Sequence, residues 1–397
     1  MKISPSIGRL PLAYRIVRSM YGIVRWIIPV RRRQIAFESH PDCNDSSLAI
    51  YQMMMTSEKV RNYRIYWLVD NPIAARQLLQ IETPQLLCGD VDVVSKDSFY
   101  GVWVFLRSAY VFSCHKMYRY AQTGRKQTII NLWHGMPIKK IAGFIEPVAG
   151  SGQSGMYSIA TSAFFAEIMA KAFSLGLDRV LVTGLPRNEW LFKSEDRYRN
   201  LRGGAKSLVV WLPTYRRTAH PGMVRADCEA SAEDPLTLGR LAEIDSGLDG
   251  YDTLVLLKLH PIDVKNTQEW PKFRHIRVVT LANTNEQRLN TYKLLACADA
   301  LVTDYSSVAI DFLLLRRPIG FYAPDSDSYT RGFIEPVHER IKRVGVQLRS
   351  TSELIEFLKN PGELQGASED IEELYHSDLL TPSRDILREI GLDDLVS

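Results

Sequence analysis

The sequence predicts an α/β protein with two Rossmann-like domains that face a cleft, preceded by an N-terminal amphipathic helix. After Arg33, short apolar runs alternate with helical stretches, as in parallel α/β units. A polar segment at 193–206 contains Gly203-Gly204, and the same alternation then restarts. A length of 397 residues suits two domains. We therefore predict domains at 34–203 and 204–397, with ligands at the carboxyl ends of the strands.

The composition excludes several classes of protein. Hydrophobic residues make up 46% and charged residues 24%, which is ordinary for a globular enzyme and excludes disordered and fibrous chains. A net charge of +4 is too small to indicate a nucleic-acid partner. The five cysteines are scattered without CxxC spacing, so neither a zinc site nor a disulfide framework is expected.

The first 33 residues predict a basic amphipathic helix that associates with a membrane. One stripe of this helix is basic and another is apolar: the basic stripe holds Arg15, Arg18 and Arg25, and the apolar one Ile16, Met20, Ile23 and Ile27. Such a helix can lie in the membrane interface. The alternative is a helix that packs on its own domain. No run is apolar enough for a transmembrane helix, and the arginines interrupt any signal-peptide core.

Apolar and β-branched runs place the strands and helices in order along the chain. In the first half we predict three helices, at Ser47–Thr56, Ile73–Gln80 and Ser162–Phe173. The strands predicted there are Gln34–Glu38, Arg64–Val69, Val91–Val94, Tyr110–Phe112, Thr128–Leu132 and Arg179–Thr183. Those predicted in the second half are Ser207–Leu212, Thr253–Leu259, Ile276–Val279, Ala300–Thr303 and Ile319–Tyr322. Arg216–Leu238 is predicted to be a long surface loop.

Two predicted strands end in a histidine. The first is followed by Trp133-His134-Gly135-Met136-Pro137, in which Pro137 suits the first turn of a helix. A histidine at a strand end can act as a general base, or it can be a structural side chain bound to the backbone. The second strand ends in Lys258-Leu259-His260. One such histidine from each domain is stronger evidence for a catalytic site than either histidine alone.

A third segment predicts an anion site. The strand that ends in Thr303-Asp304 is followed by Ser306 and Ser307, either of which can cap a helix beginning around Val308. Free N–H groups and hydroxyls at that terminus suit a phosphate. Asp311 stands four residues after Ser307, one turn into the helix. An ordinary capped helix is the alternative.

Two shorter strand-end signals complete the candidate site. Arg187 follows a strand and could clamp a pyrophosphate. Pro213 and Thr214 follow the first strand of the second half and could offer a hydroxyl donor and backbone groups. Acidic D-x-D pairs occur at Asp90 and at Asp325, but neither stands at a predicted strand end near the histidines. We expect no bound metal and no cofactor.

Taken together, these segments resemble the CDP-glycerol glycerophosphotransferase family, which builds teichoic acids and glycerol-phosphate capsules. The matching runs include QIAFES, NLWHGMPIKKIAG, GLPRNEWLF, WLPTYR, LKLHP and DALVTDYSSVAIDF. The resemblance implies a glycosyltransferase-B architecture, with an acceptor-side domain at 34–203 and a CDP-alcohol-binding domain at 204–397. It also implies a substrate site made of Trp133, His134, Gly135, Met136, Pro137, Arg187, Pro213, Thr214, Lys258, Leu259, His260, Ser306, Ser307 and Asp311.

The resemblance implies transfer of glycerol phosphate from CDP-glycerol to a hydroxyl of a membrane lipid-linked saccharide or polymer acceptor, with release of CMP. His134 is then the expected general base, and His260 is expected to help hold the pyrophosphate. A polyprenyl-diphosphate-linked saccharide is the expected acceptor. The expected location is the cytoplasmic side of the cell membrane, reached through the N-terminal helix. The alternatives are a CDP-ribitol-using transferase, a glycosyltransferase that uses a nucleotide sugar, and a non-catalytic nucleotide-binding scaffold.

Overall fold

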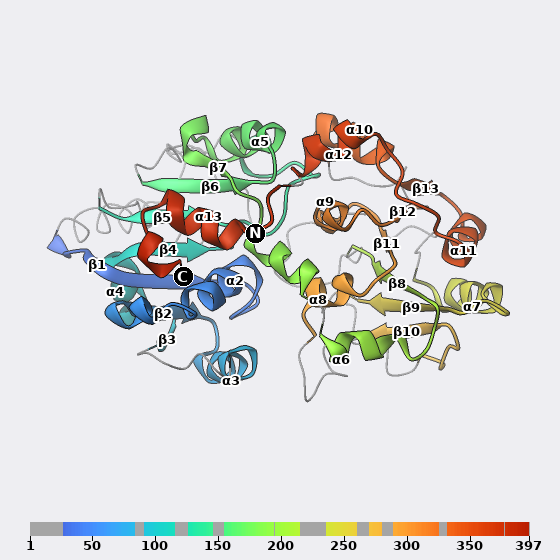
Figure 1. The fold of residues 1–397 in the computed structure, drawn as a ribbon, viewed down its shortest axis with the longest axis horizontal. Coiled ribbons are helices and arrows are strands. Elements are labelled where there is room, and N and C mark those ends of the chain that lie inside the picture. The colour runs from blue at the N-terminus through green and yellow to red at the C-terminus, as the bar shows by residue number, and fades with distance from the viewer. Residues whose placement is uncertain are drawn as a thin grey trace, which may run out of the picture. The chain divides into compact units, whose positions relative to one another are not determined.

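The computed structural model describes the chain in ten stretches that form two compact units (Figure 1). The stretches are 27–83, 91–115, 126–145, 155–193, 195–214, 236–259, 270–279, 289–324, 332–376 and 378–396. We call the unit made of 27–136, 141–189 and 376–396 the N-terminal unit, and the unit made of 137–140 and 190–375 the C-terminal unit. Each is described by itself, so the predicted cleft between two domains stays a prediction.

The observed division differs from the predicted one at several places, one of which is the segment 137–140. The chain passes from one unit to the other between Glu189 and Trp190, before the expected boundary at 203/204. The last helix, α13 (Pro382–Glu389), returns to the N-terminal unit, where it contacts α2 (Asp45–Met54) (Figure 1). Residues 1–26 of the predicted N-terminal helix lie outside the described part of the chain. The last three residues of this predicted helix belong to strand β1 (Arg31–Glu38).

The described strands of the N-terminal unit form one parallel sheet in the order β3-β2-β1-β4-β5-β6-β7. Strand β1 is an interior strand that pairs with β2 and β4, and its residues 34–38 are all buried. The other strands are β2 (Arg64–Val69), β3 (Val91–Ser95), β4 (Ser108–Ser113), β5 (Thr128–Asn131), β6 (Met156–Ala160) and β7 (Val180–Val182). The accompanying helices are α2, α3 (Pro72–Glu82), α4 (Phe99–Arg107), α5 (Ala163–Phe173) and α13, with 3-10 turns at Glu58–Asn62, Ala142–Phe144, Leu177–Arg179, Pro186–Phe192 and Asp393–Leu395.

Aromatic side chains form much of the core of the N-terminal unit. Phe37 on β1 stacks on Phe112 of β4, with ring centroids 5.1 Å apart, and on Trp67 of β2 at 5.2 Å. Tyr51 of α2 meets Phe37 edge-on at 5.7 Å. All four side chains are fully buried. Their packing anchors α2 on the sheet and so places the loop that precedes this helix at the carboxyl end of β1.

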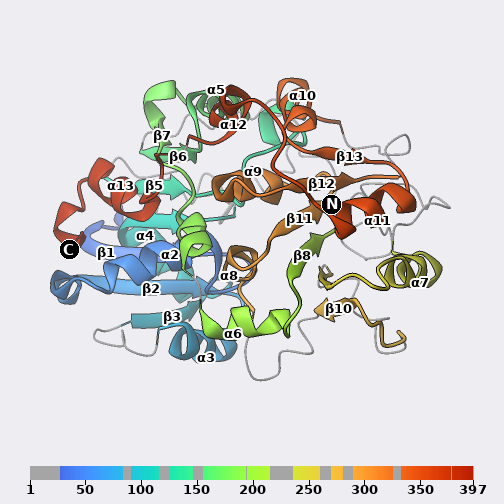
Figure 2. The ribbon, with the colours of Figure 1, turned by 45° about the vertical axis from the view of Figure 1, so that its right-hand side comes forward.

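The described strands of the C-terminal unit form a second parallel sheet in the order β10-β9-β8-β11-β12-β13 (Figure 1, and turned by 45° in Figure 2). The strands are β8 (Ser207–Leu212), β9 (Thr253–Lys258), β10 (Ile276–Val279), β11 (Ala300–Thr303), β12 (Ile319–Tyr322) and β13 (Val346–Leu348). The helices are α6 (Asp196–Arg199), α7 (Leu238–Gly247), α8 (Thr291–Ala296), α9 (Val308–Phe312), α10 (Glu335–Arg343), α11 (Thr351–Lys359) and α12 (Ser368–Leu374), with 3-10 turns at Asn200–Arg202 and Leu313–Leu315.

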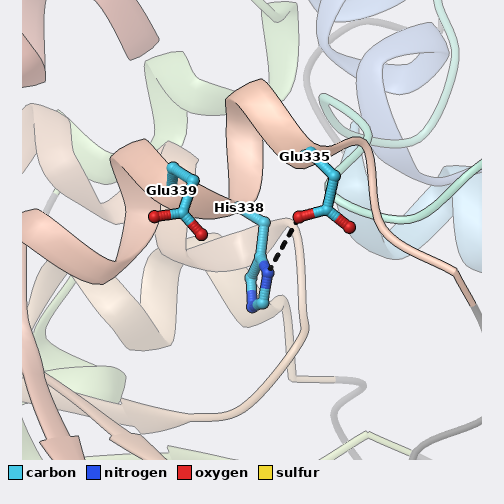
Figure 3. A group of neighbouring side chains, drawn as sticks. All are labelled: Glu335, His338 and Glu339. Atoms are coloured by element: carbon cyan, nitrogen blue, oxygen red, sulfur yellow. Dashed lines mark ion pairs between the residues drawn. The ribbon is translucent and has the colours of Figure 1, made fainter.

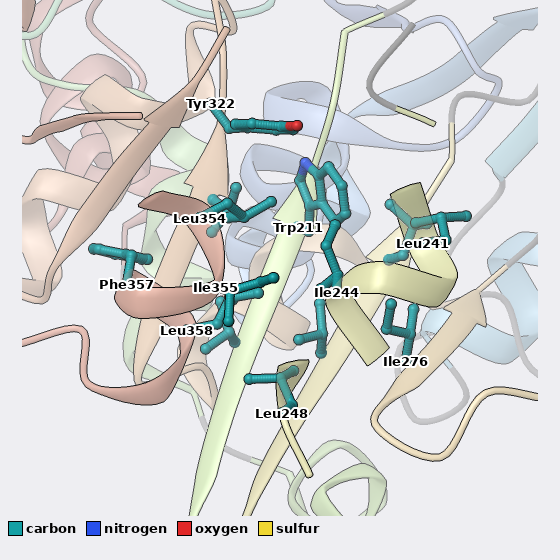
Figure 4. Close-up of a cluster of buried hydrophobic side chains, with 14 of the residues drawn as sticks. Trp211, Leu241, Ile244, Leu248, Ile276, Tyr322, Leu354, Ile355, Phe357 and Leu358 are labelled. Atoms are coloured by element: carbon teal, nitrogen blue, oxygen red, sulfur yellow. The ribbon is translucent and has the colours of Figure 1, made fainter. Parts of the chain in front are cut away.

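The hydrophobic core of the C-terminal unit lies between its sheet and helices α7 and α11 (Figure 4). Trp211 of β8 is 1% exposed and meets Tyr322 of β12 edge-on, with ring centroids 5.7 Å apart. Leu241 and Ile244 pack on it from α7, and Leu354 and its neighbours from α11. Nearly every residue of β8, β9, β11 and β12 is buried, on both faces of the sheet, which explains the β-branched and leucine-rich sequence of these four strands.

The predicted elements agree closely with the observed ones, but several observed elements were not predicted. The unpredicted helices are α4, α6, α7, α8, α10, α11, α12 and α13. Strands β8, β10, β11 and β12 begin and end where predicted. Strands β6 and β13 were missed, because Ser158 and Gln347 interrupt their short apolar runs. Helix α4 was missed because it is rich in aromatic and β-branched residues and contains Gly101. Its N-cap Ser98 accepts a hydrogen bond from the Gly101 N–H (2.9 Å). Among the described residues, no helix is long and apolar enough to cross a membrane.

Candidate active site

Each sheet reverses its strand order once, and the candidate residues gather at these two reversals. In doubly wound sheets, ligands bind beyond the carboxyl ends of the strands at such a switch point. In the N-terminal unit the reversal lies between β1 and β4, which end at Glu38 and Ser113. In the C-terminal unit it lies between β8 and β11, which lead into Thr214 and Asp304.

His134 lies beyond the carboxyl end of β5 in a strained turn. Trp133 has φ +46° and Gly135 has φ +121°, both in the left-handed region. His134 is exposed, whereas Gly135 is buried. Nδ1 of His134 lies 3.3 Å from the carbonyl oxygen of Cys114. When Nδ1 carries the proton and donates it to this carbonyl, Nε2 is the nitrogen that can accept a proton.

Two aromatic rings contact the imidazole of His134. The ring of His115 stacks on it, with centroids 4.5 Å apart and an interplanar angle of 7°. The indole of Trp133 lies 4.1 Å away at 31°, and is itself packed edge-on against Phe173 of α5 at 5.0 Å. These contacts limit the orientations that the His134 ring can adopt.

The buried carboxyl of Glu38 supports the turn that carries His115. Glu38 is 2% exposed, and its Oε2 accepts hydrogen bonds from the Ser113 hydroxyl (2.6 Å) and from the backbone N–H of His115 (3.2 Å). Burial raises the pKa of Glu38, and the bond from Ser113 opposes this. Burial, followed by the nearby positive charge of a protonated His134, lowers the pKa of His115 to about 4. His115 is therefore neutral near pH 7.

Glu38, Ser113 and His115 were not among the predicted site residues. The available signal was the one that identified His134: Ser113-Cys114-His115 follows a predicted strand at its carboxyl end. What the sequence did not show is that β4 is the neighbour of both β1 and β5. That adjacency brings the three strand ends together.

Arg187 is placed differently from the exposed clamp that was predicted. Its side chain is 5% exposed, and its Nη1 donates to both carboxylate oxygens of Asp45, at 3.1 and 3.0 Å. Its backbone N–H lies 3.5 Å from the Ser46 hydroxyl. The guanidinium thus fixes the start of α2, where Asp45 has φ +58°. A contact between Arg187 and a pyrophosphate stays a prediction.

In the C-terminal unit, Asp304 organises the loop that follows β8. Its carboxylate accepts hydrogen bonds from the Thr214 N–H (3.0 Å) and from the Thr214 hydroxyl (2.9 Å). Pro213 and Thr214 remain half-buried, as does Lys258 at the end of β9. Leu259 is 3% exposed, so its side chain belongs to the core. His260 lies outside the described residues, and its role stays a prediction.

The segment predicted to bind an anion folds differently in two respects. The helix begins at Val308 as expected, but α9 has only five residues, and the Ser306 hydroxyl accepts a weak 3.4 Å bond from the Val308 N–H. Asp311 is 0% exposed, and its Oδ2 accepts a hydrogen bond from the Tyr292 hydroxyl (2.7 Å). Asp311 is therefore buried in this unit, and its contact with a substrate stays a prediction. Ser306 and Ser307 stay half-buried at the edge of the sheet.

The remaining predicted residues, Met136 and Pro137, are buried. Met136 is 0% exposed, so packing rather than substrate contact explains its side chain in this structure. Pro137 begins the short segment that belongs to the C-terminal unit. There the carbonyl of Ile138 accepts a hydrogen bond from the Ile334 N–H (2.9 Å), and Lys139 forms a bridge with Phe333.

One cluster on α10 has side chains of the kind that bind metal ions. Ligand atoms of Glu335, His338 and Glu339 lie within 4.8 Å of one another (Figure 3). Both carboxylates are exposed, and Glu339 pairs with Lys342 at 3.0 Å. The His338 ring stacks on Phe333, with centroids 4.0 Å apart. Since protein groups already engage these side chains, we assign no metal to the cluster.

Comparison with known proteins identifies the family. Residues 20–375 match the family model described as CDP-Glycerol:Poly(glycerophosphate) glycerophosphotransferase. The chain belongs to this family. The family resemblance that the sequence motifs indicated is therefore confirmed.

Three similar proteins show the range of this family. A teichoic acid poly(glycerol phosphate) polymerase of Staphylococcus epidermidis is 25% identical over 341 residues, which cover 79% of this chain and only 43% of the relative. A teichoic acid ribitol-phosphate primase of Bacillus spizizenii is 24% identical over 350 residues, covering 80% of each chain. A solved structure of the wall teichoic acid polymerase TagF has a TM-score of 0.69 at 22% identity, covering 96% of this chain and 93% of TagF. The last similarity concerns the fold alone.

Proposed function

We propose that this glycerophosphotransferase transfers glycerol phosphate from CDP-glycerol to a hydroxyl of a membrane lipid-linked saccharide or polymer acceptor, in teichoic acid or capsule synthesis. The observation that carries the proposal is the exposed imidazole of His134 beyond the carboxyl end of β5, with Nδ1 directed to the Cys114 carbonyl. The family match and the names of the relatives support the choice of donor and of pathway.

The reaction is a phosphoryl transfer. Nε2 of His134 accepts the proton of the acceptor hydroxyl, and the oxygen attacks the phosphorus atom that bears the glycerol. A new P–O bond forms, and the bond from that phosphorus to the bridging oxygen of the pyrophosphate breaks. CMP leaves with the bridging oxygen and its electron pair. In such reactions the protein mainly positions the groups and stabilises charge.

The C-terminal unit provides the donor-side groups in this proposal. Thr214 is held by Asp304 beyond β8, and Ser306 and Ser307 follow β11, at the same edge of the sheet. Hydroxyls and backbone N–H groups at this edge suit the phosphates of a nucleotide. We assign Lys258 and His260 to the same role on the strength of the family motif.

We also propose that the protein works as a peripheral protein on the cytoplasmic side of the membrane. The N-terminal stripe of arginines and apolar residues supports this. In the described structure, helix α4 turns three aromatic side chains outward: Phe99 is 98% exposed, Tyr100 52% and Trp103 42%. Arg107 lies over the Trp103 ring, 5.0 Å from its centroid. Aromatic rings combined with arginine suit the interface of a bilayer with anionic lipids.

The deciding experiment measures CMP release from CDP-glycerol with and without a polyprenyl-diphosphate disaccharide. We expect release to depend on the acceptor. His134→Ala should lower the rate about 10²–10⁴-fold, the usual contribution of a general base. His376→Ala, at an exposed histidine of the same unit, should leave the rate unchanged. A wild-type rate in His134→Ala would remove His134 from the mechanism.

The similarity to a ribitol-phosphate primase makes CDP-ribitol the second candidate donor. CDP-glycerol, CDP-ribitol and UDP-sugars offered together to the same enzyme would distinguish the candidates. Incorporation of phosphate with glycerol supports the proposal. Phosphate with ribitol supports the second candidate, and sugar without phosphate indicates a glycosyltransferase.

A further inference from the structure

We infer that His115 is a positioning residue for His134: its flat ring orients the His134 imidazole so that Nδ1 meets the Cys114 carbonyl and Nε2 is the accepting nitrogen. The inference deepens the proposed function, because it concerns the group assigned there as the base. It rests on the contacts of the turn Ser113–His115, which nothing in the sequence motifs singled out.

The geometry of the two rings is the first argument. Two imidazoles 4.5 Å apart and 7° from parallel share a face, so rotation of the His134 ring about its χ2 angle is opposed by the His115 ring. The ring of a third histidine, His40, meets the His115 ring edge-on, with centroids 5.5 Å apart. His115 is thus the central ring of three, and of the three only His134 belongs to a motif that the sequence analysis identified.

The same turn also selects the tautomer of His134. Cys114, between Ser113 and His115, presents its carbonyl oxygen 3.3 Å from His134 Nδ1. A carbonyl only accepts, so this contact favours the tautomer with the proton on Nδ1. The Ser113 hydroxyl contacts the His115 carbonyl and donates to Glu38, and Glu38 accepts from the His115 N–H. Ring stacking and tautomer selection therefore depend on one turn held by one buried carboxyl.

The charges around His115 keep its own ring neutral at the pH at which a base must act. Burial is the largest cause of the low pKa of about 4 for His115, and a charged His134 is the next. Asp45 opposes this change, and His40 and Lys96 reinforce it. Asp70 lies in turn 2.8 Å from Lys96 and 3.6 Å from His40. A neutral His115 therefore places no positive charge beside the base.

Three variants test the inference. His115→Ala removes the ring, and His115→Phe keeps a flat ring that cannot titrate. We expect His115→Ala to lower kcat about 10- to 100-fold through misplacement of the base, with KM for CDP-glycerol little changed. His115→Phe should restore most of kcat. The matched control, His376→Ala, should behave as wild type.

Nuclear magnetic resonance of histidine side chains supplies a readout that does not depend on activity. In the wild-type protein, the ¹⁵N shifts of His134 should show the proton on Nδ1. His115→Ala should mix the tautomers of His134, and His115→Phe should not. An unchanged tautomer of His134 in His115→Ala would overturn the inference, as would equal loss of kcat in the Phe and Ala variants.

The two proposals fail in different ways. If His134→Ala keeps wild-type CMP release, the proposed role of His134 fails, whatever His115 does. If His134→Ala is inactive but His115→Ala has the wild-type kcat and His134 shifts, only the positioning role of His115 fails. The folded state of each variant is checked by its unfolding transition, and His115→Phe serves if the Ala variant does not fold.

Discussion

Arg187 and Asp45 form a buried, two-bond ion pair between segments 142 residues apart in the sequence. Their side chains are only 5% and 13% exposed. The pair connects the turn after β7 to the first residue of α2, next to the carboxyl end of β1. The Arg187 guanidinium therefore holds the start of α2 in place beside the carboxyl end of β1.

Loss of one partner of this pair should destabilise the N-terminal unit strongly. Asp45→Ala leaves the Arg187 charge buried without its carboxylate, which costs about 3–5 kcal/mol in comparable cases. The free energy of unfolding from urea titration measures this. Asp178→Ala removes the partner of Arg179 in an exposed pair, where we expect less than about 1 kcal/mol. Equal losses in both variants would contradict the structural role assigned to the buried pair.

His115 should make the protein less stable in mild acid. Its pKa falls from 6.5 to about 4 on folding, so the unfolded chain binds a proton before the folded one does. Stability should therefore rise with pH between about 4 and 6.5, by about 3 kcal/mol at most. His115→Phe cannot titrate and should flatten this slope. Chemical denaturation at a series of pH values is the measurement, and an unchanged slope would show that His115 is already solvated in the folded state.

Glu38 should act in the opposite direction. Burial raises its folded pKa above the ordinary value of 4.5, so the folded protein holds a proton that the unfolded chain has lost. Stability should fall as pH rises from 4.5 to the raised pKa. Glu38→Gln keeps an acceptor for the Ser113 hydroxyl and removes the titration. We expect this variant to lose the fall in stability over that window, and the same denaturation series measures it. Persistence of the fall would assign it to another carboxyl.

Tyr292 should stabilise the buried carboxyl of Asp311. Tyr292→Phe removes the hydroxyl that donates at 2.7 Å to a fully buried oxygen, which costs about 1–3 kcal/mol. Tyr251→Phe is the matched control, because Tyr251 is 45% exposed. Thermal unfolding of the two variants should therefore differ clearly. If they unfold alike, water replaces the lost donor and Asp311 is more accessible than its burial indicates.

Membrane binding should depend on the N-terminal residues and on helix α4. Because Arg31 pairs with Ser108 in the sheet, the deletion that spares β1 removes residues 1–26. Sedimentation with anionic liposomes should show weaker binding after this deletion and after Phe99→Ser combined with Trp103→Ser. Binding by the deleted protein should weaken further with salt, since charge attraction is screened over about 8 Å. Leu177→Ser, at an exposed leucine near α5, should have no effect. Equal binding by all variants would show that neither the N-terminal residues nor helix α4 contacts the membrane.

Local sequence was enough to locate most strands and the histidine at the end of β5. An apolar run that ends in a polar or glycine-rich turn is a local pattern, so β8, β10, β11 and β12 could be delimited from the sequence. Trp133-His134-Gly135 could be recognised for the same reason, because the strained turn and the family motif are both contiguous. The family itself followed from the order and spacing of several such motifs.

Tertiary structure alone decided which candidate side chains are exposed. Met136 stands in the same motif as His134, and Arg187 and Asp311 stand in two of the other family motifs, yet all three are buried. Asp45 and Tyr292, which meet Arg187 and Asp311, belong to other parts of the sequence. The order β1-β4-β5 likewise brings Glu38 and His115 to His134. Burial and pKa depend on these neighbours from distant segments, and a motif by itself does not specify them.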